Sequence, residues 1–144
     1  MPNTLEVDLN AYAANGYLIC PAFFSASEMD DIAQWTAEVT ALPEMPGKQM
    51  VYYEDDRRQP GSRILSRIEN FCPYHSKFND LLTHGPVVEV ANQLMGGEVV
   101  LFKEKINYKY PGSDGFRPHQ DVQAGWDTYA PLHLTMLLSI DEAT

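Results

Sequence analysis

Residues 98–110 alternate between two kinds of side chain, and this alternation constrains the fold more than any other feature. Side chains of a β-strand point to opposite faces with a period of two. One face of this segment carries Phe102, Glu104, Ile106, Tyr108 and Tyr110. The other face is basic or amide-bearing and carries Lys103, Lys105, Asn107 and Lys109. The segment is therefore predicted to be the longest strand. Its polar face either meets solvent or lines a barrel interior that holds an anion.

A second segment, residues 132–140, alternates as well and is predicted to be a strand. The connection between the two strands begins with the turn sequence PGSDG and then brings His119 and Asp121, which one residue separates. On an extended chain, residues i and i+2 point the same way, so this imidazole and carboxylate can converge on one ion. Two histidines and one carboxylate form the facial triad of non-haem Fe(II) oxygenases. We interpret His119 and Asp121 as two of three ligands to such a metal.

The His-x-Asp pattern is weak evidence by itself, because a chain with four histidines and 20 acidic residues can contain it by accident. A surface hydrogen bond between His119 and Asp121 is the simpler alternative. His133 follows closely, on the next predicted strand, and we do not expect it to be the third ligand. His75 and His84 lie at predicted helix ends, where a histidine caps the helix or meets solvent.

The remaining periodic segments predict a mixture of helices and strands. Helices are predicted over residues 5–15, 25–42, 75–83 and 86–95, and strands over residues 17–24, 50–56 and 63–71. Ser25 and Glu28 form a capping-box pattern at the start of the second helix. The buried stripe of that helix is predicted to contain Met29, Ile32, Ala33, Trp35, Thr36 and Val39. The link RRQPGS has turn chemistry and predicts a hairpin between the last two strands.

Composition bounds the partners and the setting. The formal net charge is −10, which argues against a nucleic-acid or anionic-membrane surface. A local basic pocket for an anionic substrate stays open, and Arg67 can face one, although strand arginines more often face solvent. The N-terminus lacks the features of a signal peptide, and no window approaches the roughly 18 apolar residues of a membrane span. Cys20 and Cys72 are expected to be reduced thiols. These features predict a cytoplasmic protein that acts on a small molecule.

The context of the His-x-Asp pattern resembles a known family. The segment EKINYKYPGSDGFRPHQD, followed by QAGW and LTMLLSIDEAT, resembles the phytanoyl-CoA dioxygenase-like family. The segment GYLICPAFFSASEMDDIAQW resembles that family's start, and residues 43–80 are the least informative. The resemblance implies a mainly β fold with flanking helices (α+β), a double-stranded β-helix or jelly roll. Residues 1–144 are expected to form a single domain, the N-terminal part of that jelly roll, which is incomplete in this chain.

The resemblance also implies an activity and its cofactors. The family uses Fe(II), 2-oxoglutarate and O2 to hydroxylate an unactivated carbon of a small metabolite or acyl substrate, releasing succinate and CO2. His119 and Asp121 match its first two metal ligands. Lys103 and Asn107 match positions that contact 2-oxoglutarate in relatives, and Thr135 is a further candidate for that contact.

Two departures from the family pattern leave alternatives open. The family places its third metal ligand and its 2-oxoglutarate-binding arginine well beyond the HQD sequence, and Arg117 lies too close to serve as that arginine. The chain is therefore expected to be truncated or to need a second polypeptide. Trp126 either walls the substrate pocket or packs in a core. A jelly-roll binding module without catalysis, or a cupin-like metal enzyme without redox chemistry, would fit the same residues.

Overall fold

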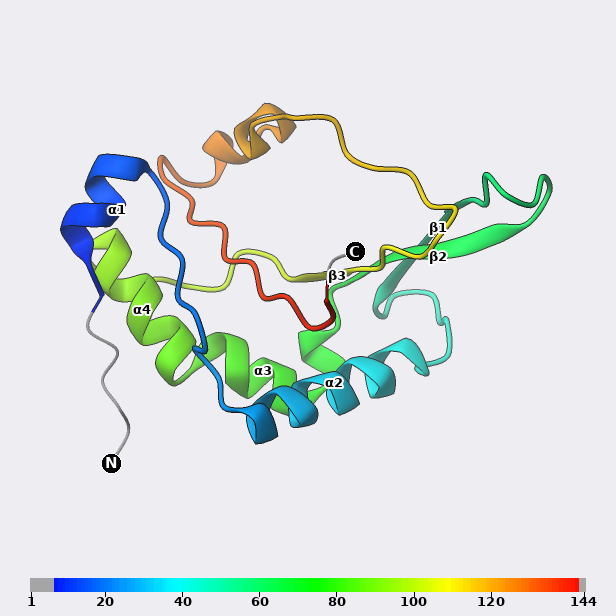
Figure 1. The fold of residues 1–144 in the computed structure, drawn as a ribbon, viewed down its shortest axis with the longest axis horizontal. Coiled ribbons are helices and arrows are strands. Elements are labelled where there is room, and N and C mark those ends of the chain that lie inside the picture. Colours follow the sequence, from blue (N-terminus) through cyan, green and yellow to red (C-terminus); the bar gives the residue numbers. More distant parts are fainter. Residues whose placement is uncertain (1–6, 143–144) are drawn as a thin grey trace.

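A computed structural model gives the structure of residues 7–142. The helices are α1 (Leu9–Asn15), α2 (Ala26–Thr40), α3 (Ser76–Thr83) and α4 (Pro86–Met95). The strands are β1 (Met50–Asp55), β2 (Arg63–Glu69) and β3 (Lys105–Asn107). Three short 3-10 helices are η1 (Cys72–Tyr74), η2 (Asp121–Ala124) and η3 (Trp126–Thr128). Helices beside an antiparallel sheet define an α+β protein, as predicted (Figure 1).

The three strands form one antiparallel sheet in the order β1-β2-β3. In its register, Val51 lies opposite Ile68, and Ile68 lies opposite Ile106. Ile68 and Ile106 belong to the buried core cluster, and Val51 packs against it. This apolar row therefore fixes which face of the sheet is covered, because a slip of one residue would turn it to the other face.

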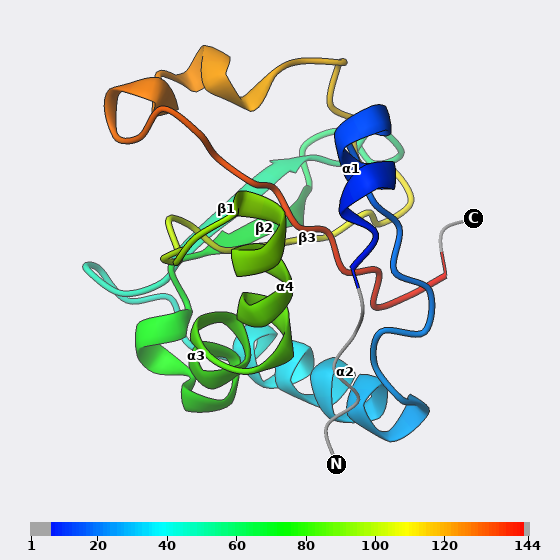
Figure 2. The ribbon, with the colours of Figure 1, turned by 90° about the vertical axis from the view of Figure 1, so that its left-hand side faces the viewer.

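The opposite face of the sheet is polar. Tyr52, Arg67 and Asn107 occupy one row of the register, and Glu69 lies opposite Lys105 in the next row on that face. Figures 1 and 2 show α2 and α3 on one side of the sheet, and η2 and η3 on the other. Because α2 and α3 cover the apolar face, the polar face is turned toward the side on which η2 and η3 lie.

Helix α2 begins with the predicted capping box. The Ser25 hydroxyl accepts a hydrogen bond from the Glu28 amide, and the Glu28 carboxylate accepts one from the Ser25 amide at 2.7 Å. Ile32 and Val39 are fully buried and join the core cluster under the sheet. Ala33, predicted for the same stripe, is exposed, so the buried stripe is narrower than its helical spacing indicated.

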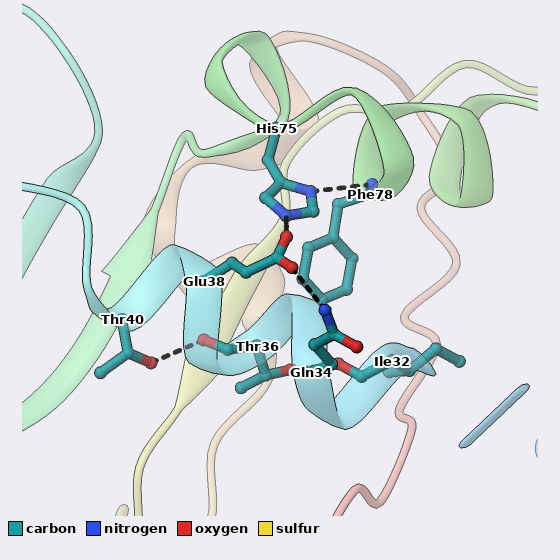
Figure 3. A network of polar contacts seen from close by, with 7 residues as sticks. All are labelled: Ile32, Gln34, Thr36, Glu38, Thr40, His75 and Phe78. Atoms are coloured by element: carbon teal, nitrogen blue, oxygen red, sulfur yellow. Dashed lines mark hydrogen bonds and ion pairs between the residues drawn. The ribbon is translucent and has the colours of Figure 1, made fainter. Parts of the chain in front are cut away.

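A polar network joins α2 to α3 (Figure 3). The ring of His75 accepts a hydrogen bond at Nδ1 from the Phe78 amide, which caps α3, and its Nε2 lies 3.0 Å from Glu38. Gln34 donates to the same carboxylate. The hydrogen bond from His75, followed by that from Gln34, lowers the pKa of Glu38 below its ordinary value. His75 is therefore used as a helix cap and a bridge between two helices.

The predicted helices and the hairpin are confirmed, with ends that differ by a few residues. Helix α1 begins at Leu9, and residues 5 and 6 of that prediction lie outside the described residues. The helix ends at Asn15 and is capped by Gly16, whose φ of 76° is the left-handed conformation that glycine adopts readily. Within residues 7–142, no helix combines the length and the apolar character required to cross a membrane.

The other strand predictions are wrong in whole or in part. Residues 17–24 form no strand, because Pro21 has no amide hydrogen and Ala22, with a φ of 50°, turns the chain. The predicted strand over residues 98–110 shrinks to Lys105–Asn107, where β2 supplies hydrogen-bond partners. Residues 132–140 form no strand, because no described strand lies beside them to complete a ladder. The described strands form one sheet, and the double-stranded β-helix stays a prediction.

Candidate metal-binding pocket

His119 and Asp121 lie together on the irregular connection that follows the PGSDG turn. Both line one pocket of about 380 Å³, whose wall also includes Trp126, His133 and Thr135. The side chain of His119 is 50% exposed and that of Asp121 is 34% exposed. The two predicted ligands are thus brought to the same cavity and remain accessible from it.

The ring of His119 is oriented by the backbone. Its Nδ1 lies 2.6 Å from the carbonyl oxygen of Arg117, a hydrogen bond in which the ring nitrogen must donate. In the neutral ring, Nε2 then carries a lone pair. A backbone carbonyl on the distal ring nitrogen is the usual way that a metal-binding histidine is held in the correct tautomer.

The Nε2 atom of His119 lies close to a carboxylate. Nε2 lies 3.4 Å from Oδ1 of Asp121, so two acceptors oppose each other unless a cation or a second ring proton lies between them. Two ligands at about 2.1 Å from one ion, at a right angle, are about 3.0 Å apart. The observed 3.4 Å exceeds this value by a few tenths of an ångström, so a small approach of the two groups would let both hold one divalent cation. Neutral imidazole with a hard carboxylate suits Fe(II).

The second oxygen of Asp121 has its own partner. The hydroxyl of Thr135 donates a hydrogen bond of 3.0 Å to Oδ2 of Asp121. Thr135 was predicted to contact 2-oxoglutarate, and that contact stays a prediction. In the structure its hydroxyl contacts the predicted metal ligand. It holds the carboxylate so that Oδ1 is the oxygen directed at His119.

A third ligand is missing from this part of the chain. No group of three or more His, Cys, Asp or Glu side chains in residues 7–142 is arranged to hold a metal ion. His133 lines the same pocket, but its Nε2 lies 2.9 Å from the Trp126 carbonyl oxygen and its ring packs against Phe102 at 4.9 Å. These contacts give His133 a packing role.

Trp126 connects the pocket to the sheet. Its ring lies 5.5 Å from that of Phe102 in an edge-to-face arrangement, and the Lys103 ammonium lies 5.9 Å from the Trp126 ring centroid. Trp126 therefore walls the pocket on one side and meets the chain that leads into β3 on the other. Lys103 lies where the polar face of the sheet approaches the pocket.

Lys103 is held by a buried acid that the sequence did not single out. Glu69 is only 3% exposed, and its Oε1 lies 3.2 Å from Lys103 Nζ and 2.8 Å from Arg67 Nε. Both contacts are ion pairs that lack the alignment of a hydrogen bond. Asn107, the other residue predicted to contact 2-oxoglutarate, is exposed on β3 opposite Arg67. The sequence does not show whether a glutamate on an alternating strand forms a buried ion pair or faces solvent.

The PGSDG turn that precedes the pocket is held by contacts with the β1–β2 hairpin. The Arg57 amide donates to the Gly112 carbonyl at 3.1 Å, and the Arg57 side chain forms an ion pair with Asp114. The Asp114 amide donates to the carboxylate of Glu54 at 3.1 Å. A Cβ atom on Gly112 would collide with the Asp56 carboxylate, and the φ of 98° also favours glycine there. We refer to residues 54–58 with 112–114 as the hairpin clamp.

Comparison with known proteins identifies the family of the chain. The family model for phytanoyl-CoA dioxygenase (PhyH) matches residues 12–144. A 2-aminoethylphosphonate dioxygenase from an uncultured bacterium is 40% identical over 127 residues, which cover 88% of this chain and 48% of that protein. A methylphosphonate hydroxylase from Gimesia maris is 35% identical over 144 residues, covering 99% of this chain and 54% of that protein. No solved structure gives a significant match.

A more distant relative has a related name. A probable alpha-ketoglutarate-dependent hypophosphite dioxygenase from Stutzerimonas stutzeri is 26% identical over 140 residues, covering 92% of this chain and 46% of that protein. The imidazole and carboxylate in one pocket define a candidate iron site, and the family match covers nearly the whole chain. The chain belongs to the phytanoyl-CoA dioxygenase family. It spans about half the length of the curated relatives it matches.

Proposed function

We propose that the protein is an Fe(II)- and 2-oxoglutarate-dependent dioxygenase that hydroxylates a carbon of a small organophosphonate. The observation that carries the proposal is the 3.4 Å separation of His119 Nε2 and Asp121 Oδ1 in one accessible pocket. Family membership supports the reaction type. The substrate class is supported by relatives whose names specify 2-aminoethylphosphonate and methylphosphonate.

The residues of the pocket have separate tasks in this proposal. His119 and Asp121 hold the iron, which when bound supplies the oxidising chemistry with O2 and the 2-oxo acid. The Arg117 carbonyl keeps the His119 ring proton on Nδ1, and Thr135 keeps Oδ1 of Asp121 directed at the metal position. Both contacts hold the side chains of His119 and Asp121 in their binding orientation before any metal binds, which raises their affinity for the metal.

Lys103 and Asn107 are proposed to bind 2-oxoglutarate. Lys103 is 37% exposed and carries an ammonium beside the wall of the pocket, so it can attract a carboxylate without losing its packing on Trp126. Asn107 is exposed on the same polar face of the sheet and offers an amide donor. Trp126 is proposed to exclude water from one side of the substrate.

Several further features belong to the same proposal. The family reading requires a third ligand and a distal arginine, and we propose that both come from polypeptide outside residues 7–142. The polar sheet face is then the inner surface of the jelly roll. We also propose that residues 1–144 contribute to a single domain and that the protein acts in the cytoplasm.

The test is a coupled consumption assay on the protein at its full natural length, prepared without metal. We expect succinate release from 2-oxoglutarate to require Fe(II), O2 and methylphosphonate together, and His119→Ala to abolish it. His84→Ala is the matched control, because His84 lies at the end of α3 beside Thr83 and lines no part of the pocket.

Two outcomes would contradict the proposal. Absence of succinate release under every condition would leave a binding module. Metal-dependent conversion of a substrate without succinate would instead support a cupin-like enzyme without redox chemistry.

A further inference from the structure

The polar face of the sheet holds two cations around one buried carboxylate. Glu69 is buried, while the side chains of Arg67 and Lys103 are 27% and 37% exposed. One carboxylate between two permanent cations leaves a surplus of one positive charge. In a chain with a formal net charge of −10, this local surplus marks a place where an anion is favoured.

The guanidinium of Arg67 is held on two sides. Its central carbon lies 4.3 Å from the centroid of the Tyr52 ring, and its Nε lies 2.8 Å from Glu69. The contacts of Arg67 with described residues thus use the ring face and Nε, and they leave both terminal nitrogens for a ligand. A stacked guanidinium with free terminal nitrogens is suited to bidentate recognition of a phosphonate, phosphate or carboxylate.

The position of Arg67 relates it to the pocket. It lies directly opposite Asn107 across the β2–β3 ladder. Lys103 shares the Glu69 carboxylate with Arg67 and lies 5.9 Å from the centroid of the Trp126 ring, which walls the pocket. A chain of contacts therefore leads from Arg67 through Glu69 and Lys103 to the pocket that contains His119.

We propose that Arg67 binds the phosphonate group of the substrate, while Glu69 fixes its spacing from Lys103. This inference rests on the proposed function and adds a residue that determines substrate specificity. Two anions have to be bound by the same enzyme, the substrate and the 2-oxo acid, and Glu69 presents two cations side by side. Lys103 is assigned to 2-oxoglutarate under the proposed function, which leaves Arg67 for the phosphonate, two of whose oxygens its planar fork can engage at once.

The test separates the two anions. Methylphosphonate is titrated by calorimetry into the metal-free protein at full natural length, and 2-oxoglutarate is titrated into the Mn(II)-loaded protein without O2. We expect Arg67→Gln to weaken methylphosphonate binding by about tenfold or more, as loss of a charged hydrogen-bonding partner does, and to leave 2-oxoglutarate binding unchanged. Arg67→Lys keeps the charge without the fork and is expected to give an intermediate affinity.

Arg63→Gln is the matched control. Arg63 lies on the same strand and also stacks on a tyrosine, with its guanidinium 4.8 Å from the Tyr53 ring centroid, but it has no carboxylate partner among the described residues. Its replacement is expected to leave both affinities unchanged. Equal weakening by Arg63→Gln and Arg67→Gln would overturn the inference, because it would reduce the effect to general charge.

Each of the remaining outcomes also supports or overturns the assignment of Arg67. Loss of 2-oxoglutarate binding with intact methylphosphonate binding in Arg67→Gln would assign Arg67 to the cosubstrate and overturn the inference. No methylphosphonate binding by the unmodified protein would overturn it as well. Binding that depends on Arg67 in a protein that releases no succinate would refute the proposed function and leave the binding site standing. Thermal unfolding of each variant by circular dichroism identifies any variant that has lost its fold, and Arg67→Lys then carries the comparison.

Discussion

The hydroxyl of Thr135 donates a hydrogen bond of 3.0 Å to Oδ2 of Asp121, across a separation of 14 residues in the sequence. The contact ties residues 132–140, which form no strand, to the start of η2. It also leaves Oδ1 of the same carboxylate 3.4 Å from His119. One hydroxyl thus decides which oxygen of the predicted ligand faces the imidazole.

Replacing Thr135 by valine is expected to weaken divalent-metal binding by about tenfold, the usual effect of removing a partner that orients a ligand. The side chain keeps its volume and loses only the donor. A Co(II) titration followed by absorbance measures the affinity. Thr135→Ser, which keeps the hydroxyl, is the control, and an unchanged affinity in Thr135→Val would contradict the orienting role.

His119→Ala is expected to remove saturable Co(II) binding, whereas His133→Ala is expected to retain it. The reason is that Nε2 of His119 is free to face Asp121, while Nε2 of His133 is used by the Trp126 carbonyl. His133→Ala should lower the melting temperature instead, because the ring packs against Phe102. Loss of metal binding in His133→Ala would identify it as a ligand and refute this assignment.

Gly112→Ala is expected to destabilise the protein by roughly 1–3 kcal/mol, since its φ of 98° strains an L-residue and the new Cβ meets the carboxylate of Asp56. Chemical denaturation measures the change. Gly115→Ala in the same turn is the control, because no atom lies within 4 Å of its Cβ position. Equal effects of the two substitutions would show that the hairpin clamp adds nothing at Gly112.

Stability is expected to depend on pH through Glu28. Hydrogen bonds from Ser25 lower the pKa of Glu28 below 4.5 in the folded protein. A lowered folded-state pKa means that the carboxylate stabilises the fold above about pH 4.5 and ceases to do so as the pH falls through the lower value. Glu28→Gln should therefore melt below the unmodified protein at pH 7, and the gap should close in acid. A gap that stays constant down to pH 3 would show that ionisation of Glu28 does not contribute to stability.

Cys72 is expected to resist alkylation. Burial, followed by the nearby charge of Glu104, raises the pKa of its thiol to about 12. At pH 8 roughly one thiol in ten thousand is then ionised, and the thiolate is the reactive form. Iodoacetamide should modify the less buried Cys20 first, and Cys72 only in denaturant. Mass spectrometry of digests follows both sites, and a Cys20→Ser variant should show no fast modification.

Local chemistry made much of the fold predictable. The Ser25–Glu28 capping box and the glycine that ends α1 act within one helical turn, so the sequence contains all the information they need. The strand predicted over residues 132–140 was wrong because alternation predicts a strand only where a second strand supplies hydrogen bonds. Glu69 was missed for a similar reason, since its partner Lys103 is distant in sequence.

The site was predictable to the extent that its members are close in sequence. His119 and Asp121 meet because one residue separates them, and Trp126 follows a few residues later. The hydrogen bond from Thr135 to Asp121 was not foreseen, because a hydroxyl that orients a carboxylate has the same residue type as one that binds a ligand, and the ligand contact stays a prediction. Sequence alone offered no means of choosing between these two partners.

The hairpin clamp makes the β1–β2 connection part of the architecture of the pocket, although it lines none of it. Arg57 and Glu54 fasten the turn only a few residues ahead of His119. A surface hairpin usually tolerates insertions freely, since its tip moves without disturbing anything else. Here a longer tip would displace the turn at residues 112–114, and with it the start of the connection that carries His119 and Asp121. The length of the hairpin tip is therefore expected to be limited by the position that the connection carrying His119 must keep.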